Sequence, residues 1–272
     1  MRPILLAILL LVGCRDEAER GGIVSLLPSF TEIVVELGAA DQLVGCTQHC
    51  KPGREVARVP WQGPDALEPI VRLAPAVVLR QVPRDGPDAL GEALRRAEID
   101  VVAVQSETIA DIKTAIRLIG KVVRRTDRAA ALATRLDRAL AATRAAVAGK
   151  TPPGVLFVIG RDAGQASNIQ AAGVGTFLNE LIECAGGRNV VATLPGAYPR
   201  VELEQLVRLA PDVIIDNLPG EENVMDAWRA ILHVPAIENG KVFPVRDPSL
   251  LIPGPRLADV VARLAEMFHG TP

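Results

Sequence analysis

The stretch Val71-Arg72-Leu73-Ala74-Pro75 recurs, letter for letter, at Val207 to Pro211, and an apolar run rich in β-branched residues follows each copy. A glutamate, Glu68 or Glu204, stands three residues before each copy. A repeated unit of this kind predicts two similar halves, each with one carboxylate at the same structural position. This pair of carboxylates is the strongest functional clue in the sequence.

The composition limits the number of domains and the classes of partner that can be expected. A chain of 272 residues forms either one large domain or two of ordinary size, and the repeat favours two. Apolar residues make up 49% of the chain, enough for two cores. With a formal net charge of −2 and no basic stripe, nucleic acid is not an expected partner.

The first fourteen residues read as a targeting segment. Arg2 supplies a positive start, and the apolar run from Pro3 to Val12 is too short to span a bilayer as a helix. Small residues then precede Cys14, which resembles a bacterial lipoprotein signal with Cys14 as the lipidated residue. An ordinary cleaved signal peptide and an uncleaved anchor are the alternatives. All three predict an exported, extracytoplasmic protein, and the first predicts a lipoprotein anchored to a membrane.

Short apolar strands alternate with helical patterns through both halves. This alternation predicts an α/β fold of two lobes, each a mainly parallel sheet flanked by helices. Expected strands lie at 22–27, 42–46, 76–80, 100–104, 155–159, 189–192, 212–216 and 241–245. Expected helices lie at 28–38, 65–73, a segment ending near 98, 108–120, 175–185, 202–209 and 255–268.

Between the halves lies an alanine-, leucine- and arginine-rich segment, Thr126 to Lys150. It predicts one long, stiff helix of about 35 Å that joins the lobes. Thr126 or Asp127 can cap its start and Gly149 can end it. The predicted organisation is a signal peptide with its cysteine at 1–14, an N-terminal lobe at 21–122, the backbone helix at 126–150 and a C-terminal lobe at 153–272.

Two sets of residues resemble a known family. The first is Trp61-Gln62-Gly63, Leu67-Glu68, Ile70-Val71, Leu73 and Pro75, with one inserted residue near 64–66. The second is Gly186-Gly187, Asn189-Val190, Tyr198-Pro199, Val201, Glu204-Gln205 and Pro211. With the long helix and the leader, they resemble the helical-backbone (class III) substrate-binding proteins of ABC importers, closest to the cobalamin receptors. The resemblance covers essentially the whole mature chain.

The resemblance implies a function and a partner. It implies that cobalamin, or a related corrinoid, is captured between the lobes and delivered to an ABC permease dimer with its ATPase subunits, without a cofactor of the protein's own. In that family a glutamate on each lobe meets arginines of the permease, and Glu68 and Glu204 match those positions. The alternative is that both carboxylates simply favour helix N-termini.

Ligands of open α/β sheets bind beyond the carboxyl ends of the strands, so the loops there should form a slot between the lobes. Trp61 and Tyr198 are expected to pack on a flat ring system while amides and guanidinium groups bind its edge. Partial core packing is the alternative for both rings. The expected ligand-binding residues are Ser29, Phe30, His49, Trp61, Gln62, Gln81, Arg161, Tyr198, Asn217, Asp247 and Arg256.

His49 is the candidate axial ligand for a cobalt or iron centre, since neutral imidazole binds both metals; an ordinary polar loop residue is the alternative. Cys46 and Cys50 flank it, and a disulfide or two buried thiols is expected there because a structural zinc site needs four ligands. Cys184 lies in an apolar helical pattern and is expected to be a small core residue.

Three other functions compete with this hypothesis. An exported enzyme is disfavoured because the sequence lacks recognisable catalytic motifs. A receptor for bare zinc or manganese is disfavoured because the three histidines lie in separate segments. A haem or ferric-siderophore receptor is the serious alternative. Haem favours an axial ligand such as His49 or Tyr198, and anionic siderophores favour a cluster of arginines, for which Arg80, Arg161 and Arg256 are candidates.

Overall fold

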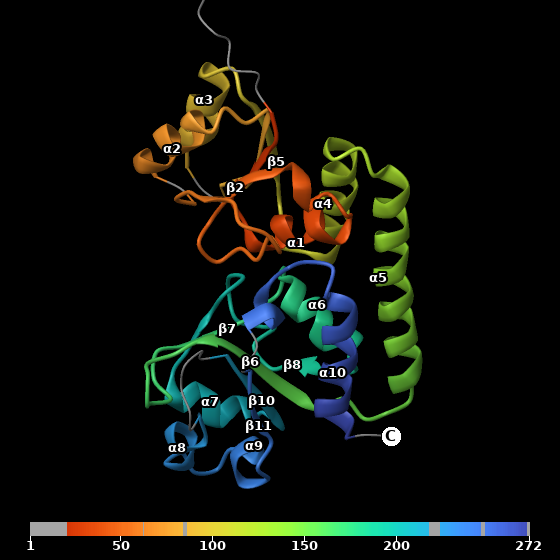
Figure 1. Cartoon of the computed structure of the whole chain (residues 1–272). Helices are drawn as coiled ribbons and strands as arrows, with labels where there is room; N and C mark the ends of the chain where they lie inside the picture. Colours follow the sequence, from red (N-terminus) through yellow and green to blue (C-terminus); the bar gives the residue numbers. More distant parts are fainter. Residues whose placement is uncertain (1–20, 62, 84–85, 218–223, 246–247, 271–272) are drawn as a thin grey trace, which may run out of the picture.

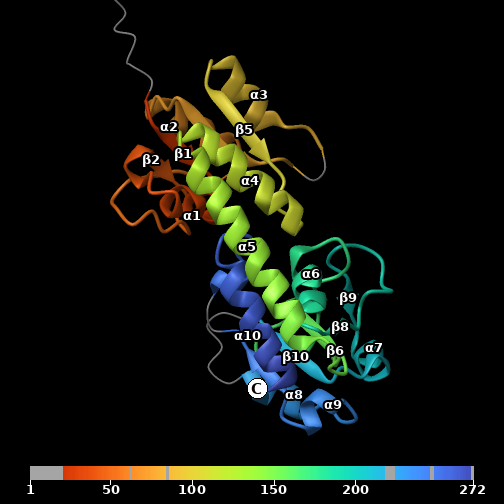
Figure 2. The ribbon, with the colours of Figure 1, turned by 90° about the vertical axis from the view of Figure 1, so that its right-hand side faces the viewer.

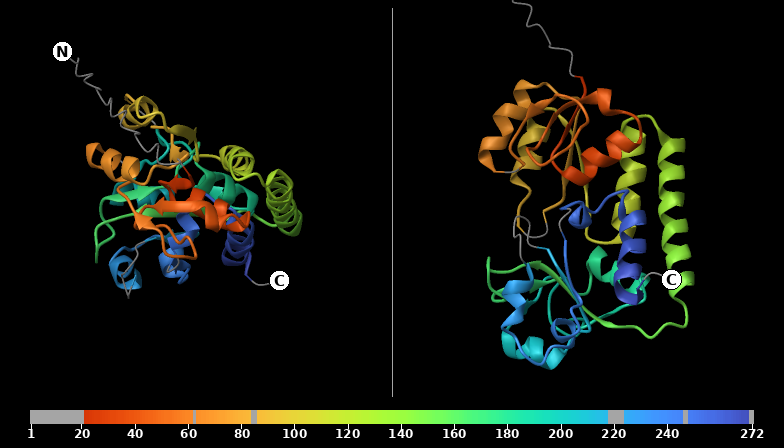
Figure 3. Two further views of the ribbon diagram at one scale, coloured as in Figure 1. Left: turned by 45° about the horizontal axis from the view of Figure 1, so that its top comes forward. Right: turned by 60° about the horizontal axis from the view of Figure 1, so that its bottom comes forward.

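The computed structural model describes residues 21–61, 63–83, 86–217, 224–245 and 248–270. Cys14, Gln62 and Asp247, for which lipidation or ligand binding is expected, lie outside the described residues. Two α/β lobes lie one above the other, and one long helix runs along the side of both (Figures 1 and 3). The expected fold class is confirmed.

Lobe one is built on a five-stranded, wholly parallel sheet in the order β3-β2-β1-β4-β5. Its strands are β1 (Ile23–Ser25), β2 (Leu43–Cys46), β3 (Ala57–Arg58), β4 (Val77–Gln81) and β5 (Asp100–Val104). Its helices are α1 (Pro28–Glu36), η1 (Ala40–Gln42), η2 (Pro64–Ala66), α2 (Leu67–Arg72), α3 (Ala89–Arg96) and α4 (Ile109–Val122).

Successive residues of a strand point to opposite faces of the sheet, and in lobe one both faces are covered. Ile23 and Leu79 pack with α1 and α4 in one core cluster, whereas Val24 and Val78 pack with α2 and α3 in another. This explains the continuous apolar runs in the sequence. The lobe therefore has three layers, with α1 and α4 on the side of the long helix (Figure 1).

Lobe two repeats these three layers. Its strands are β6 (Gly154–Gly160), β7 (Ile169–Ala171), β8 (Arg188–Asn189), β9 (Arg200–Val201), β10 (Val213–Asp216) and β11 (Val242–Pro244). Its helices are α6 (Phe177–Cys184), α7 (Leu203–Leu209), α8 (Val224–Arg229), α9 (Pro235–Glu238), η3 (Pro248–Leu251) and α10 (Leu257–His269). Residues Val155 and Phe157 face the core beside α6 and α10, and Leu156 and Val158 face the core beside α7 and α8.

The parallel parts of the two sheets correspond strand for strand. In lobe one β1 pairs with β2 and β4, and β4 pairs with β5; in lobe two β6 pairs with β8 and β10, and β10 pairs with β11. Lobe two adds an antiparallel pair, because β7 runs antiparallel to both β6 and β9. The sequence patterns did not predict β7 and β9.

The five-residue repeat has the same backbone in both lobes. Glu68 and Glu204 are each the second residue of a helix, α2 or α7. Each helix is followed by an alanine in the left-handed region, Ala74 with φ 44° and Ala210 with φ 42°, directly before a proline that leads into β4 or β10. Proline disfavours the right-handed helical conformation of the residue before it, so the repeat turns the chain from helix to strand.

The long helix α5 (Thr126–Val147) packs against α4 of lobe one and α10 of lobe two (Figure 2). A Cβ on Gly120 of α4 would lie 2.3 Å from Ala129 Cβ, so α4 and α5 can pack this closely only with glycine there. The expected side-chain cap by Thr126 or Asp127 is wrong, because Arg125 occupies the N-cap and makes no side-chain cap bond. Gly149, with φ 81°, follows the end of the helix as expected.

Candidate ligand slot between the lobes

Three adjoining hollows lie at the carboxyl ends of β1, β2 and β4, with volumes of about 710, 530 and 200 Å³. We call them together the slot. The residues after these strands, 26–28, 47–51 and 81–83, line it, as do Arg58, Val59, Pro60 and Trp61. Ile252 and Arg256 add a wall from lobe two. The largest hollow alone has the size of a site for a small organic ligand.

Trp61 and His49 are the expected ligand residues most open to the slot. The Trp61 side chain is an exposed aromatic ring, with 58% of the residue accessible, and it borders two of the hollows. His49 is exposed and borders the hollows of about 710 and 530 Å³, and its Nε2 lies 3.1 Å from Nε2 of Gln48. An exposed indole in a concave wall offers a face for a flat ring system.

Glu107, three residues after the end of β5, links the two lobes. It accepts hydrogen bonds from Gln81 Nε2 at 3.2 Å and from the Tyr198 hydroxyl of lobe two at 3.1 Å. Glu180 of α6 accepts a bond from the backbone N–H of Ile109 at 2.7 Å. The first turns of α4 and α6 are therefore joined directly, and the expected ligand residues Gln81 and Tyr198 meet at this junction.

A second interlobe contact crosses the slot. Arg256, the N-cap residue of α10, donates from Nε to Oε1 of Glu32 on α1. Both residues line the hollow of about 530 Å³. From the sequence, Arg256 was expected to bind the ligand, and neither Glu32 nor Glu107 was among the expected site residues. Glu107 follows the strand expected at 100–104, and the rule used for the other strands would have found it.

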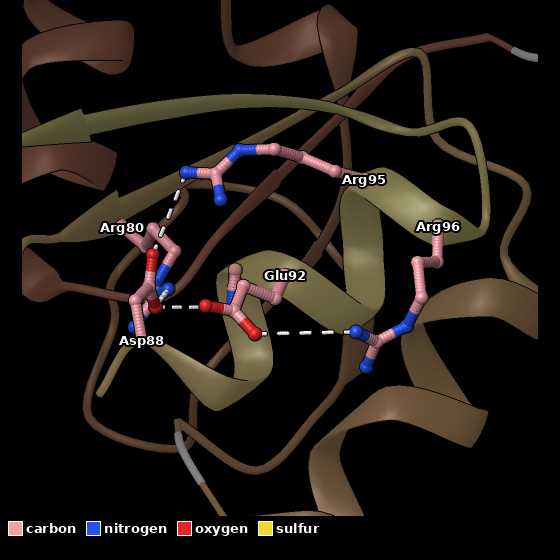
Figure 4. A network of polar contacts seen from close by, with 6 residues as sticks. Arg80, Asp88, Glu92, Arg95 and Arg96 are labelled. Atoms are coloured by element: carbon pink, nitrogen blue, oxygen red, sulfur yellow. Dashed lines mark hydrogen bonds and ion pairs between the residues drawn. The ribbon is translucent and has the colours of Figure 1, made fainter.

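Arg80 and Arg161 are each tied to a carboxylate of their own lobe. Arg80, on β4, contacts Asp88 at the start of α3, within a network that includes Arg95 (Figure 4). Burial, and then Arg95, lower the pKa of the Arg80 guanidinium. Arg161 Nε donates to Asp216 Oδ2 at 2.7 Å, and both side chains have 0% exposure.

Four of the expected ligand residues are buried and do not line the slot in this structure. Phe30 is fully buried in the core because helix α1 turns its ring toward α4, and Ser29 is 2% exposed. Asn217 is 3% exposed and Arg161 is enclosed by Asp216 and Trp228. Each directly follows a strand or begins a helix, but packing turns the side chain inward.

Cys46 and Cys50 are buried free thiols beneath the loop that carries His49. Arg58 Nη1 donates to Cys46 Sγ at 3.0 Å and to the Cys50 carbonyl at 3.1 Å. Burial, and then the neighbouring Cys50, raise the pKa of the Cys46 thiol to about 11. Cys184 is a buried core thiol as expected, and its Sγ donates to the Leu140 carbonyl at 3.3 Å.

At pH 8 these thiols are expected to resist alkylation in the folded protein and to react fully after unfolding. Only the thiolate attacks, and a pKa of about 11 leaves Cys46 almost wholly protonated at that pH. Mass spectrometry after iodoacetamide treatment, with and without denaturant, measures this. Rapid labelling of the native protein, or a native mass lower by two hydrogens, would contradict the assignment of buried thiols.

Two negative findings hold for the described ranges. Among those residues, no group of three or more histidine, cysteine, aspartate or glutamate side chains is arranged to hold a metal ion. Within the same part of the chain, no helix combines the length and the apolar character that a membrane span requires.

Comparison with known proteins shows the family. Residues 23–248 match the model of the periplasmic binding protein family, and the chain belongs to that family. With its two lobes and the long helix between them, it has the class III substrate-binding fold expected from the sequence. It is therefore a solute-binding protein of the ABC importer class, and its family places it outside the cytoplasm.

Several relatives and structural neighbours are named for the tetrapyrrole-type ligands that they bind. The cobalamin-binding protein of Halobacterium salinarum is 28% identical over 94% of this chain and 71% of its own length. A periplasmic haem-binding protein from Pseudomonas aeruginosa has a TM-score of 0.74 and 27% identity, covering 92% of this chain and 93% of that one. The periplasmic vitamin B12 binding protein of Vibrio cholerae has a TM-score of 0.75 at 22% identity, covering 91% and 96%.

Proposed function

We propose that this protein is a membrane-anchored substrate-binding lipoprotein that captures cobalamin, or a related corrinoid, in the slot and delivers it to an ABC permease. The observation that carries the ligand proposal is the pairing of the three arginines that an anionic ligand would need. Arg80, Arg161 and Arg256 each contact a carboxylate of the protein, Asp88, Asp216 or Glu32.

Paired arginines favour one class of ligand. Anionic siderophores and the two propionates of haem carry negative charge, which is best bound by cations without a protein partner. A corrin ring is edged mainly by neutral amides, which hydrogen-bond to carboxylates, guanidinium groups and glutamine side chains. Glu32, Gln48 and Arg256 line the slot and offer these groups. The named ligand of the Halobacterium relative supports the same choice.

The corrinoid is the cargo, and the protein is proposed to have no cofactor of its own and no enzymatic activity. Trp61 would pack on the face of the ring, and His49 would stand as the candidate axial ligand to the metal. Gln81 and Tyr198 lie at the interlobe junction, where they would bind the ring edge. ATP is hydrolysed by the ATPase subunits that serve the permease.

We propose Glu68 and Glu204 as the docking carboxylates for arginines of the permease dimer. Both glutamates are exposed. Each is the second residue of its helix, α2 in lobe one and α7 in lobe two. Glu68 already accepts a bond from Arg72 at 2.6 Å, with 81% of its side chain exposed, so water screens that pair. Cys14 would carry the lipid that keeps the receptor near the permease.

A haem or ferric-siderophore receptor is the second candidate. The likeness to the Pseudomonas aeruginosa protein favours haem. Exposed His49 is a suitable axial ligand for haem iron as well as for cobalt. In this case Arg256 would have to leave Glu32 to bind a propionate.

Titration of the chain purified without residues 1–14 tests the ligand. We expect tight binding of cobalamin, with weaker binding of haem and of a ferric siderophore, followed by visible absorption and by calorimetry. Trp61→Ala should weaken the binding of cobalamin by about 10- to 100-fold, since an aromatic anchor in a concave site contributes that much. Tight binding of haem without binding of cobalamin would overturn the choice of ligand.

A further inference from the structure

The contact between Glu32 and Arg256 is held from two sides. The Glu32 side chain is 12% exposed and the Arg256 side chain 47%, so the carboxylate is largely enclosed while the guanidinium reaches the hollow. A Cβ on Gly254 would lie 3.0 Å from Glu32 Oε2, which means that the loop before Arg256 packs directly on the carboxylate. The position of Glu32 is therefore set by both lobes.

This arrangement changes what Arg256 can bind. Alone, a guanidinium at the wall of the slot would attract a carboxylate and form a charge-assisted pair. Beside Glu32 its charge is balanced, and an incoming carboxylate meets a fixed negative charge at short range. A neutral amide avoids this repulsion, because its N–H can donate to Glu32 and its carbonyl can accept from Arg256. The other charged side chains of this hollow, Glu36 and Lys51, have opposite signs.

We infer that Glu32 is a specificity-determining residue, which makes the slot select ligands edged with amides over ligands edged with carboxylates. The inference rests on the proposed function and deepens it by naming the chemistry at the edge of the ligand. It assigns the discrimination to one carboxylate of lobe one rather than to the shape of the slot.

Two pairs of probe ligands test the effect of negative charge at the edge of the ligand. The first pair is cyanocobalamin and its monocarboxylic acid, in which one side-chain amide is hydrolysed. The second pair is haem and haem dimethyl ester. For Glu32→Gln we expect the affinity for the acid, relative to its neutral partner, to rise by about tenfold in each pair that binds, since one charged hydrogen bond is gained. For Arg256→Gln we expect the ratio of the affinity for the acid to the affinity for its neutral partner to fall below the wild-type ratio.

The affinity ratio is expected to rise for Glu32→Gln and to fall for Arg256→Gln. Damage to the fold would not give these opposite changes, because it would weaken the binding of the acid and of its neutral partner alike. Glu92→Gln, which removes one negative charge from the exposed face of α3, serves as the control and should leave the ratio unchanged. A Glu32→Gln ratio equal to that of the wild type, or no gain in haem binding relative to the ester, would overturn the inference.

Failure of the proposed function gives a different result. If the wild type ignores every corrinoid but the haem pair shows the expected changes of ratio, the role of Glu32 holds and cobalamin is the wrong cargo. If cobalamin binds tightly and neither ratio responds to Glu32→Gln, the cargo is right and the inference about Glu32 is wrong.

Discussion

Reversing Glu68 and Glu204 to arginine together is expected to abolish uptake while the protein still captures its ligand in solution. Facing like charges across an interface costs several kcal/mol, so binding to the permease should weaken by at least about a hundredfold. Glu68 and Glu204 are both exposed, and neither is among the residues that line the slot. Uptake of labelled cobalamin by cells, together with titration of the purified variant, measures the two effects separately.

A matched double reversal controls for net charge. Asp127 on α5 and Glu266 on α10 are exposed, one beside each lobe, and they lie on the helix layer across the sheets from α2 and α7. Asp127→Arg with Glu266→Arg changes the charge by the same amount and should leave uptake near the wild-type level. Normal uptake by the Glu68 and Glu204 variant would exclude the docking role.

Asp216→Asn is expected to lower the free energy of unfolding by about 3–5 kcal/mol, because it removes the negative charge that faces the buried guanidinium of Arg161. The carboxylate also accepts a bond from Trp228 Nε1 at 2.6 Å, and the Arg161 guanidinium carbon lies 5.8 Å from the Trp228 ring centre. The Asp216 side chain thus binds both the Arg161 guanidinium and the Trp228 indole. Denaturant unfolding followed by tryptophan fluorescence measures the loss.

The matched substitution is Asp226→Asn, in an exposed pair with Arg229 at 3.1 Å. Exposed pairs contribute about 0–1 kcal/mol, so this variant should unfold close to the wild type. If the two substitutions have equal effects, Arg161 and Asp216 do not form a structural pair.

Local patterns were sufficient to predict the framework of the fold. The apolar run of β10 and the helical segment Thr126 to Lys150 were both expected within a few residues of their observed bounds. The strands β7 and β9 have three and two residues and lack an apolar run, so their pairing with β6 depends on the rest of lobe two. The patterns therefore predicted the parallel strands except the two-residue β3, and they missed the antiparallel pair of lobe two.

The candidate site divides in the same way. Trp61 and His49 were predicted because each lies in a loop beyond a strand, where packing leaves side chains open. Arg161 and Asn217 follow strands too, but the side chain of Arg161 is enclosed by Asp216 and by Trp228 of α8, and Asn217 is buried. Position along the chain predicts which edge of the sheet a residue occupies and not which way its side chain turns.

By itself the sequence determined the two corresponding lobes, the helix that joins them and the edge of each sheet where a ligand can bind, because periodicity and a repeated motif are local properties. Only the tertiary structure decided which charges balance one another at that edge. Glu32 and Arg256 are 224 residues apart, and Glu107 and Tyr198 are 91 apart. Contacts over such separations form only when the folded lobes come together, and no local pattern encodes them.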